Sequence, residues 1–116
     1  MSICPTETLT VNNINATTST CSTCEDDVAP CGIIPENTIS LKFTTKASGG
    51  DVSINFSNLS FVIEPGRDEE LQAALIEATT PCNQTTYTYL GNCESSQTGN
   101  FSINAAGLAG NTTYYI

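Results

Sequence analysis

Residues 101–116 read FSINAAGLAGNTTYYI, and this stretch decides the fold. Phe101, Ile103 and Ala105 alternate with polar residues, which is the period of a half-buried β-strand. Residues 107–110 supply two glycines, which can take the backbone angles that a chain reversal requires. Residues 112–116 return to strand composition. The stretch therefore predicts a strand, a turn and the beginning of another strand.

The same alternation occurs earlier in the chain. Apolar and polar residues alternate over residues 39–46, which predicts a strand. Residues 48–51, Ser-Gly-Gly-Asp, predict a turn. Alternation then returns over 52–57 and over 59–63, before a Pro-Gly pair. This region is either two closely joined strands or one bulged strand.

The period changes over residues 68–78. Apolar side chains there recur at helical spacing, and three acidic residues precede them, where carboxylates stabilise the positive end of a helix dipole. We expect a short helix of about three turns. The apolar positions are Leu71, Ala74, Leu75 and Ala78.

Strand composition resumes over residues 85–90, with Tyr87 and Tyr89 on one face. Everything after residue 38 therefore predicts an all-β body with one inserted helix. The last strand ends on aromatic and apolar residues without a following turn. We expect either that a longer chain continues there or that this end pairs with a neighbour's edge.

The segment 39–61 together with 101–116 resembles fibronectin type III and related immunoglobulin-like modules. Residues 107–115, Gly-Leu-Ala-Gly-Asn-Thr-Thr-Tyr-Tyr, carry most of the likeness. In that family a Gly-Leu, a short turn, Thr and then Tyr connect the fifth strand to the sixth. The resemblance implies that Leu108 is buried and that Tyr114 packs at the corner between these strands.

The resemblance implies an immunoglobulin-like β-sandwich and a role in adhesion, spacing or display rather than catalysis. The family recurs in bacterial surface proteins and in tailed-phage particles. This chain departs from the family pattern in three respects. It has no Trp, no seventh strand follows residue 116, and residues 68–78 and 82–93 look inserted.

Apolar side chains are distributed unevenly. Val, Ile, Leu and Phe number 25 of 116, and only five of them fall in residues 1–32. A segment this poor in apolar residues cannot bury enough surface to fold alone. We therefore predict an extended, cysteine-containing arm over residues 1–35 and a sandwich over 36–116, incomplete at its C-terminal end if the chain continues.

The charge excludes several partners. Twelve acidic and three basic residues give a net charge of −9, so the chain lacks the basic surface that nucleic acids and anionic membranes require. Ser, Thr and Asn together supply 40 residues, which predicts a neutral polar surface. Met1 to Ala16 have no signal-peptide pattern, so we expect synthesis in the cytoplasm.

The arm contains Cys4, Cys21, Cys24 and Cys31, and Cys21-Ser-Thr-Cys24 has the spacing of half a zinc site. Four thiolates can hold a tetrahedral zinc and so fold the arm. Cys4 and Cys31 lack a matching spacing, however, and the acidic residues 25–27 disfavour clustered thiolates. Disulfides or free thiols are therefore favoured over zinc, and no other cofactor is expected.

Cys82 and Cys93 bracket the strand predicted around Tyr87. A bridge between them closes a short loop, worth roughly 3 kcal/mol in the chain-entropy model. We expect this disulfide in an oxidising environment.

Enzymatic chemistry is not expected. Histidine is absent, so the commonest general base near neutral pH is missing. The acidic runs at residues 25–27 and 68–70 lack the pattern of a calcium-binding loop and are interpreted as solvated surface.

Tyr87, Tyr89 and Tyr115 offer flat apolar rings with polar tips, which suit contact with a sugar or a protein partner. The alternative is that about half of the tyrosines belong to the core or its corners.

We expect a structural, non-enzymatic bacteriophage virion protein, such as a head-decoration or fibre subunit. Its arm would anchor to capsid or other virion proteins while the sandwich projects, and a homo-oligomer is expected because the arm cannot bury itself. A different hypothesis is a carbohydrate- or receptor-binding adhesin module of a larger protein on a bacterial cell surface. A third is a small zinc-dependent interaction module.

Overall fold

The computed structural model describes residues 8–12, 39–60, 71–81, 83, 86–96 and 99–116. Most of the predicted arm, including Cys4, Cys21, Cys24 and Cys31, lies outside these residues, as do Cys82 and the acidic residues 68–70. Residues 8–12 form neither helix nor strand.

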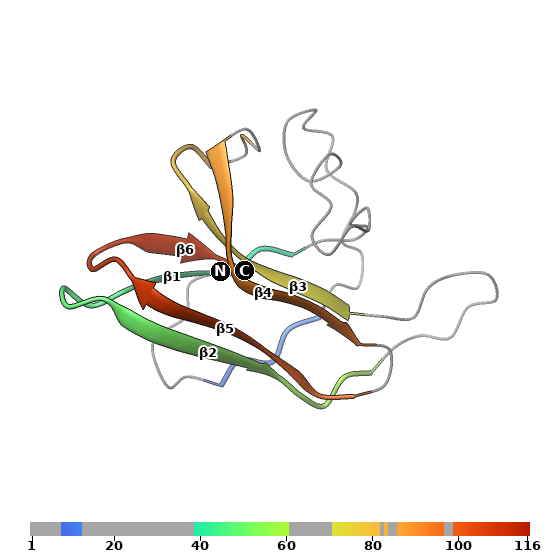
Figure 1. The fold of residues 1–116 in the computed structure, drawn as a ribbon. Helices are drawn as coiled ribbons and strands as arrows, with labels where there is room; N and C mark the ends of the chain where they lie inside the picture. The colour runs from blue at the N-terminus through green and yellow to red at the C-terminus, as the bar shows by residue number, and fades with distance from the viewer. Residues whose placement is uncertain (1–7, 13–38, 61–70, 82, 84–85, 97–98) are drawn as a thin grey trace.

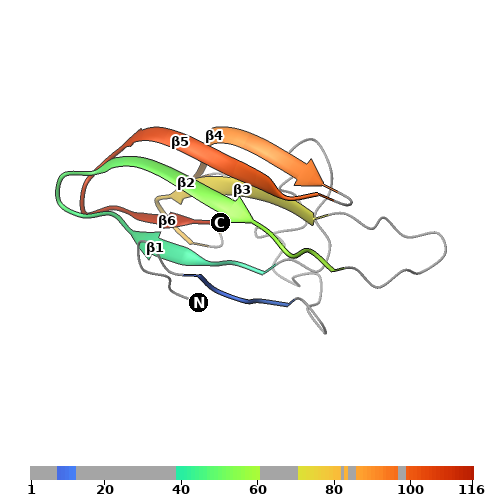
Figure 2. The ribbon, with the colours of Figure 1, turned by 90° about the horizontal axis from the view of Figure 1, so that it is seen from below.

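The described residues form two antiparallel sheets and no helix, which confirms the all-β class (Figure 1). The larger sheet has four strands in the order β1-β6-β3-β4, and the smaller one pairs β2 with β5. Figure 2 shows β2 and β5 running side by side. The strands are β1 (Lys42–Thr44), β2 (Gly50–Phe56), β3 (Leu71–Ala78), β4 (Tyr87–Ser96), β5 (Phe101–Leu108) and β6 (Thr113–Tyr115).

The helix predicted over residues 68–78 is wrong for residues 71–78, which form strand β3. β3 lies inside the larger sheet, with β4 on one side and β6 on the other. Because β3 carries apolar residues on both of its faces, it shows no polar alternation, and its apolar residues can mimic helical spacing. Three consecutive residues of β3, Ala73, Ala74 and Leu75, are buried.

Strand β4 is longer than predicted because it passes through a bulge. Ala73 lies opposite Glu94 and Leu75 opposite Leu90, so three residues of β4 face one residue of β3. The bulge begins at Gly91, whose φ of 70° is unfavourable for residues with a side chain. Figure 1 shows the β3–β4 hairpin bending, so that its tip stands away from the other strands.

Two turns interlock at one end of the molecule. The carbonyl of Lys46 accepts hydrogen bonds from the backbone N–H of Gly49 (2.9 Å) and from that of Asn111 (3.2 Å). The hydroxyl of Thr45 donates to the carbonyl of Ala109 at 2.6 Å. Position 110 has no space for a side chain, because a Cβ on Gly110 would collide with the backbone of residue 47. We call these two turns the clasp, residues 45–49 and 109–112.

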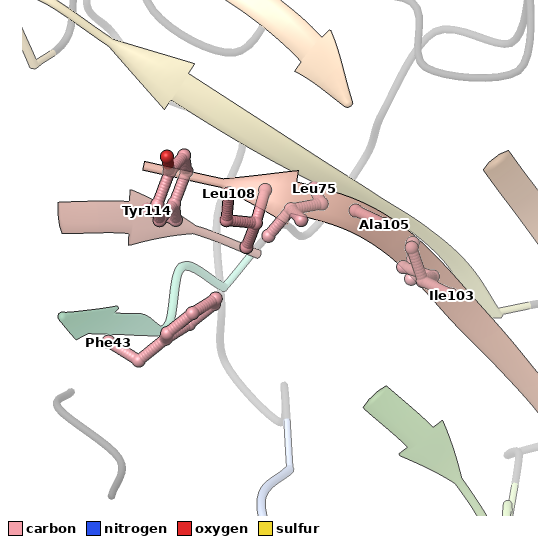
Figure 3. Close-up of a cluster of buried hydrophobic side chains, with 7 residues drawn as sticks. Phe43, Leu75, Ile103, Ala105, Leu108 and Tyr114 are labelled. Atoms are coloured by element: carbon pink, nitrogen blue, oxygen red, sulfur yellow. The ribbon is translucent and has the colours of Figure 1, made fainter. Parts of the chain in front are cut away.

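The core lies between the two sheets (Figure 3). Leu75 and Ile103 are fully buried and come from different sheets, so one core joins the two layers. The ring centroids of Phe43 and Tyr114 lie 5.8 Å apart within it. The remaining core members are Ala73, Ala105 and Leu108, with Val52, Ile54, Phe56, Leu90, Phe101 and Ile116 packed against them.

Candidate functional site

The strand registers place the three predicted contact tyrosines on one face of the larger sheet. Directly paired residues of neighbouring strands point to the same face. Ile76 of β3 pairs with Tyr89 of β4 and with Tyr115 of β6, and Tyr115 also pairs with Lys42 of β1. One row therefore crosses the whole sheet in the order Lys42, Tyr115, Ile76, Tyr89.

The neighbouring pair extends this row. Tyr87 lies two residues before Tyr89 on β4 and pairs with Ala78 of β3. Leu75 and Tyr114, which alternate with Ile76 and Tyr115, point into the core, so the row lies on the outer face. We call this surface the tyrosine face; its described residues are Lys42, Ile76, Ala78, Tyr87, Tyr89 and Tyr115.

The tyrosine face is open to solvent to different degrees. Tyr89 retains 45% of its surface and is the most exposed large apolar residue among those described. Tyr87, Tyr115 and Ile76 are half-buried, whereas Lys42 is exposed. The face thus combines accessible aromatic surface with a single ammonium group.

The electrostatics of the tyrosine face favour neutral contacts. Partial burial, with a smaller contribution from Tyr87, raises the pKa of Tyr89 above its usual value of 10.0. The described acidic side chains lie elsewhere: Asp51 is on β2, and Glu77 and Glu94 pair with Tyr114 and Ala73, which are not residues of the tyrosine face.

The outer face of the smaller sheet is chemically different. It carries Ser and Asn side chains in directly paired positions, Ser53 with Asn104 and Asn55 with Ser102. The hydroxyl of Ser102 donates to Oδ1 of Asn55 at 2.7 Å. The two outer faces of the molecule therefore offer aromatic contact on one side and neutral hydrogen bonding on the other.

Leu108 and Tyr114, the predicted corner residues, lie close to the clasp. They are 6% and 1% exposed. The phenol oxygen of Tyr114 accepts a hydrogen bond from the backbone N–H of Ala109 at 2.9 Å. This bond ties the start of β6 to the end of β5.

Asn92 has a structural role that the sequence did not indicate. Its Oδ1 accepts from the backbone N–H of Asn104 at 2.6 Å, and its Nδ2 donates to the carbonyl of Ser102 at 3.1 Å and to Glu94 at 2.9 Å. One side chain thus bonds the β4 bulge to β5 and joins the two sheets. A Gly-Asn pair inside a strand pattern signals a bulge, but it does not show which strand the amide will contact.

Of the six cysteines, the structure describes only Cys93. Cys93 lies in the β4 bulge and takes part in a disulfide bond. Cys82, its predicted partner, is outside the described residues, as are the four cysteines of the alternative zinc site. Within the described part of the chain, no group of three or more His, Cys, Asp or Glu side chains is arranged to hold a metal.

Over the residues that the structure describes, no helix is long and apolar enough to cross a membrane. In the comparisons with known proteins, no family model matches the chain, and neither a curated protein nor a solved structure is significantly similar to it.

Proposed function

We propose that this chain is a structural, non-enzymatic subunit of a bacteriophage particle, a head-decoration or fibre protein. The immunoglobulin-like body, residues 36–116, projects, and the arm over residues 1–35 anchors it to capsid or other virion proteins. The observation that carries the proposal is the architecture of the described residues: two sheets share one core and are locked together at the clasp. Such a body suits spacing and display.

The interlocked turns support this proposal in two ways. Thr45, Lys46 and Asn111 exchange hydrogen bonds between turns that are more than 60 residues apart in the chain. Hydrogen bonds between turns so distant in the chain brace the body at this end. The Tyr114 to Ala109 bond supports the immunoglobulin-like assignment, because related modules carry a tyrosine bonded back to the preceding corner.

Immunogold labelling tests the proposal. Antibodies raised against the full chain are applied to phage particles and to cell envelopes from the organism that encodes it. We expect gold on intact particles at regular positions. Label confined to the cell envelope overturns the virion assignment, and turnover by the purified chain overturns the non-enzymatic one.

The mass of the full chain in solution gives a second test. We expect a homo-oligomer, since an arm poor in apolar residues needs a partner surface. A monomer whose mass and shape are unchanged by reductant would count against both the anchoring arm and the bridges.

A second candidate is an adhesin module of a bacterial surface protein. The tyrosine face favours it, because aromatic side chains exposed on a rigid sheet are typical of recognition surfaces. Gold on the cell envelope and none on particles is the result that this candidate expects.

A further inference from the structure

We propose that the tyrosine face binds a neutral glycan, with the rings of Tyr89 and Tyr115 stacking against two sugar rings that are separated by one intervening ring. This inference goes beyond the proposed function, because it applies equally to a particle subunit and to a surface module. The face has three properties that a sugar-binding platform needs: flat apolar rings, spacing matched to an oligosaccharide and the absence of repelling charge.

The spacing follows from the sheet. Tyr89 and Tyr115 lie on either side of Ile76 in one row, two strands apart. Neighbouring strands are about 4.8 Å apart, so the two Cα positions are separated by roughly 10 Å. This separation is comparable to the length of a disaccharide unit, so the two tyrosines reach the first and the third of three consecutive sugar rings. Tyr87, two residues from Tyr89 on the same strand, extends the platform by about 7 Å along the strand direction.

The chemistry of the face matches sugar rings. The apolar surface of a pyranose lies against an aromatic ring, while its hydroxyls need donors and acceptors at the edge of the contact. Ile76 provides the apolar floor between the two rings. The phenol of Tyr89 is protonated at neutral pH, as tyrosine phenols ordinarily are, so it can both donate and accept. The ammonium group of Lys42 adds donors at the end of the row.

Charge selects the ligand class. The chain carries a net charge of −9, so acidic polysaccharides are repelled at a distance. The described residues of the face include no carboxylate, so a neutral glycan meets neither repulsion nor a buried unpaired acid.

Affinity electrophoresis of the full chain in gels containing one polysaccharide tests the proposal. Neutral probes are hydroxyethylcellulose, laminarin and glucomannan, and polygalacturonate is the acidic comparison. We expect at least one neutral polymer to retard the chain and polygalacturonate not to. Calorimetry with the matching oligosaccharide series should show weak binding of the monosaccharide and the disaccharide and tighter binding from the trisaccharide upward, because only then are both tyrosines engaged.

Variants locate the site. Tyr89→Ala and Tyr115→Ala should each weaken binding roughly tenfold, the loss of one aromatic contact. Tyr89→Phe keeps the ring and should retain most of the affinity, which separates stacking from misfolding. Ser53→Ala, on the opposite outer face, is the matched control and should bind as the parent does.

Three results would overturn the inference: no retardation by any neutral polymer, binding that survives both alanine substitutions, or self-association that Tyr89→Ala abolishes. The last would identify the face as a contact between copies. None of them bears on where the chain resides, which the gold labelling decides separately.

Discussion

At the scale of single residues, the clasp depends on two glycines that bring backbones into contact. A Cβ on Gly110 would collide with the carbonyl of Ala47, and one on Gly49 would collide with the carbonyl of Leu108. Both obstructing groups are backbone atoms and cannot rotate away. The sequence predicted turns here, but it did not predict that the turns contact each other.

Gly110→Ala should therefore destabilise the protein by about 1–3 kcal/mol, the usual cost of overpacking. Gly99→Ala is the control, since a Cβ there would meet only Ser96 Oγ at 3.5 Å, an ordinary contact. Urea unfolding of the two variants measures the difference. Equal stabilities would show that the clasp adjusts without cost.

A second prediction at the residue scale concerns the phenol group of Tyr114 and its contribution to stability. Tyr114→Phe removes the acceptor of a part-buried hydrogen bond from the backbone N–H of Ala109, which should cost about 0.5–1.5 kcal/mol. Tyr115→Phe, one residue away on the outer face, should stay within about 0.5 kcal/mol of the parent. Thermal or urea unfolding compares the pair, and a neutral Tyr114→Phe would mean that water replaces the bond.

Tyr89 makes stability depend on pH at the alkaline end. Burial raises the pKa of Tyr89 in the folded state above 10.0. Between pH 10.0 and this raised pKa, the native state keeps a proton that the unfolded state has lost. The contribution is fully present below pH 10.0 and disappears as the pH rises through the folded pKa. Tyr89→Phe should flatten this part of the stability curve, as measured by urea midpoints across the alkaline range. An unchanged slope would contradict it.

At the scale of strands, alternation identified β2, β5 and the beginning of β4, because each has one face in the core and one in solvent. It failed for β3, since that strand is flanked by β4 and β6 and three consecutive residues are buried. Helical spacing in a short apolar segment cannot be distinguished from a covered strand by period alone.

Local alternation predicts only part of the tyrosine face. Tyr87 and Tyr89 share a face by simple alternation, so their proximity was predictable. Tyr115 joins them only because β6 lies beside β3, a pairing between residues 76 and 115 that no local pattern encodes. Asn92 was not predictable either, since nothing in the sequence distinguishes it from the other ten asparagines.

Asn92 provides the prediction for this scale. Asn92→Ala removes the acceptor for the Asn104 N–H and the donor to the Ser102 carbonyl. Because the site is partly solvated, we expect a loss of about 0.5–1.5 kcal/mol rather than more. Amide hydrogen exchange should show faster exchange at Asn104. Asn104→Ala, which keeps that backbone N–H and alters only an exposed side chain, is the control and should leave its protection in place.

At the scale of the whole molecule, most acidic residues lie outside the part of the chain that forms the described core. The described residues include two lysines and three acidic side chains, whereas nine acidic residues and one arginine belong to the rest of the chain. The described residues are thus close to neutral, and apolar burial in the shared core is their main source of stability.

The shared core makes the two sheets one cooperative unit, and the distribution of tyrosines allows a direct test. All four tyrosines lie on β4 and β6 of the larger sheet, and the chain has no Trp, so intrinsic fluorescence reports on that sheet alone. Ile103 is fully buried on β5, in the smaller sheet.

Ile103→Ala should lower the free energy of unfolding by about 2–5 kcal/mol. Tyrosine fluorescence and circular dichroism should shift to the same lower urea midpoint, because removing core volume from one sheet loosens the surface on which the other packs. If fluorescence kept the parent midpoint while circular dichroism lost amplitude early, the sheets would unfold separately, and the body would not be the rigid unit on which the proposed display function depends.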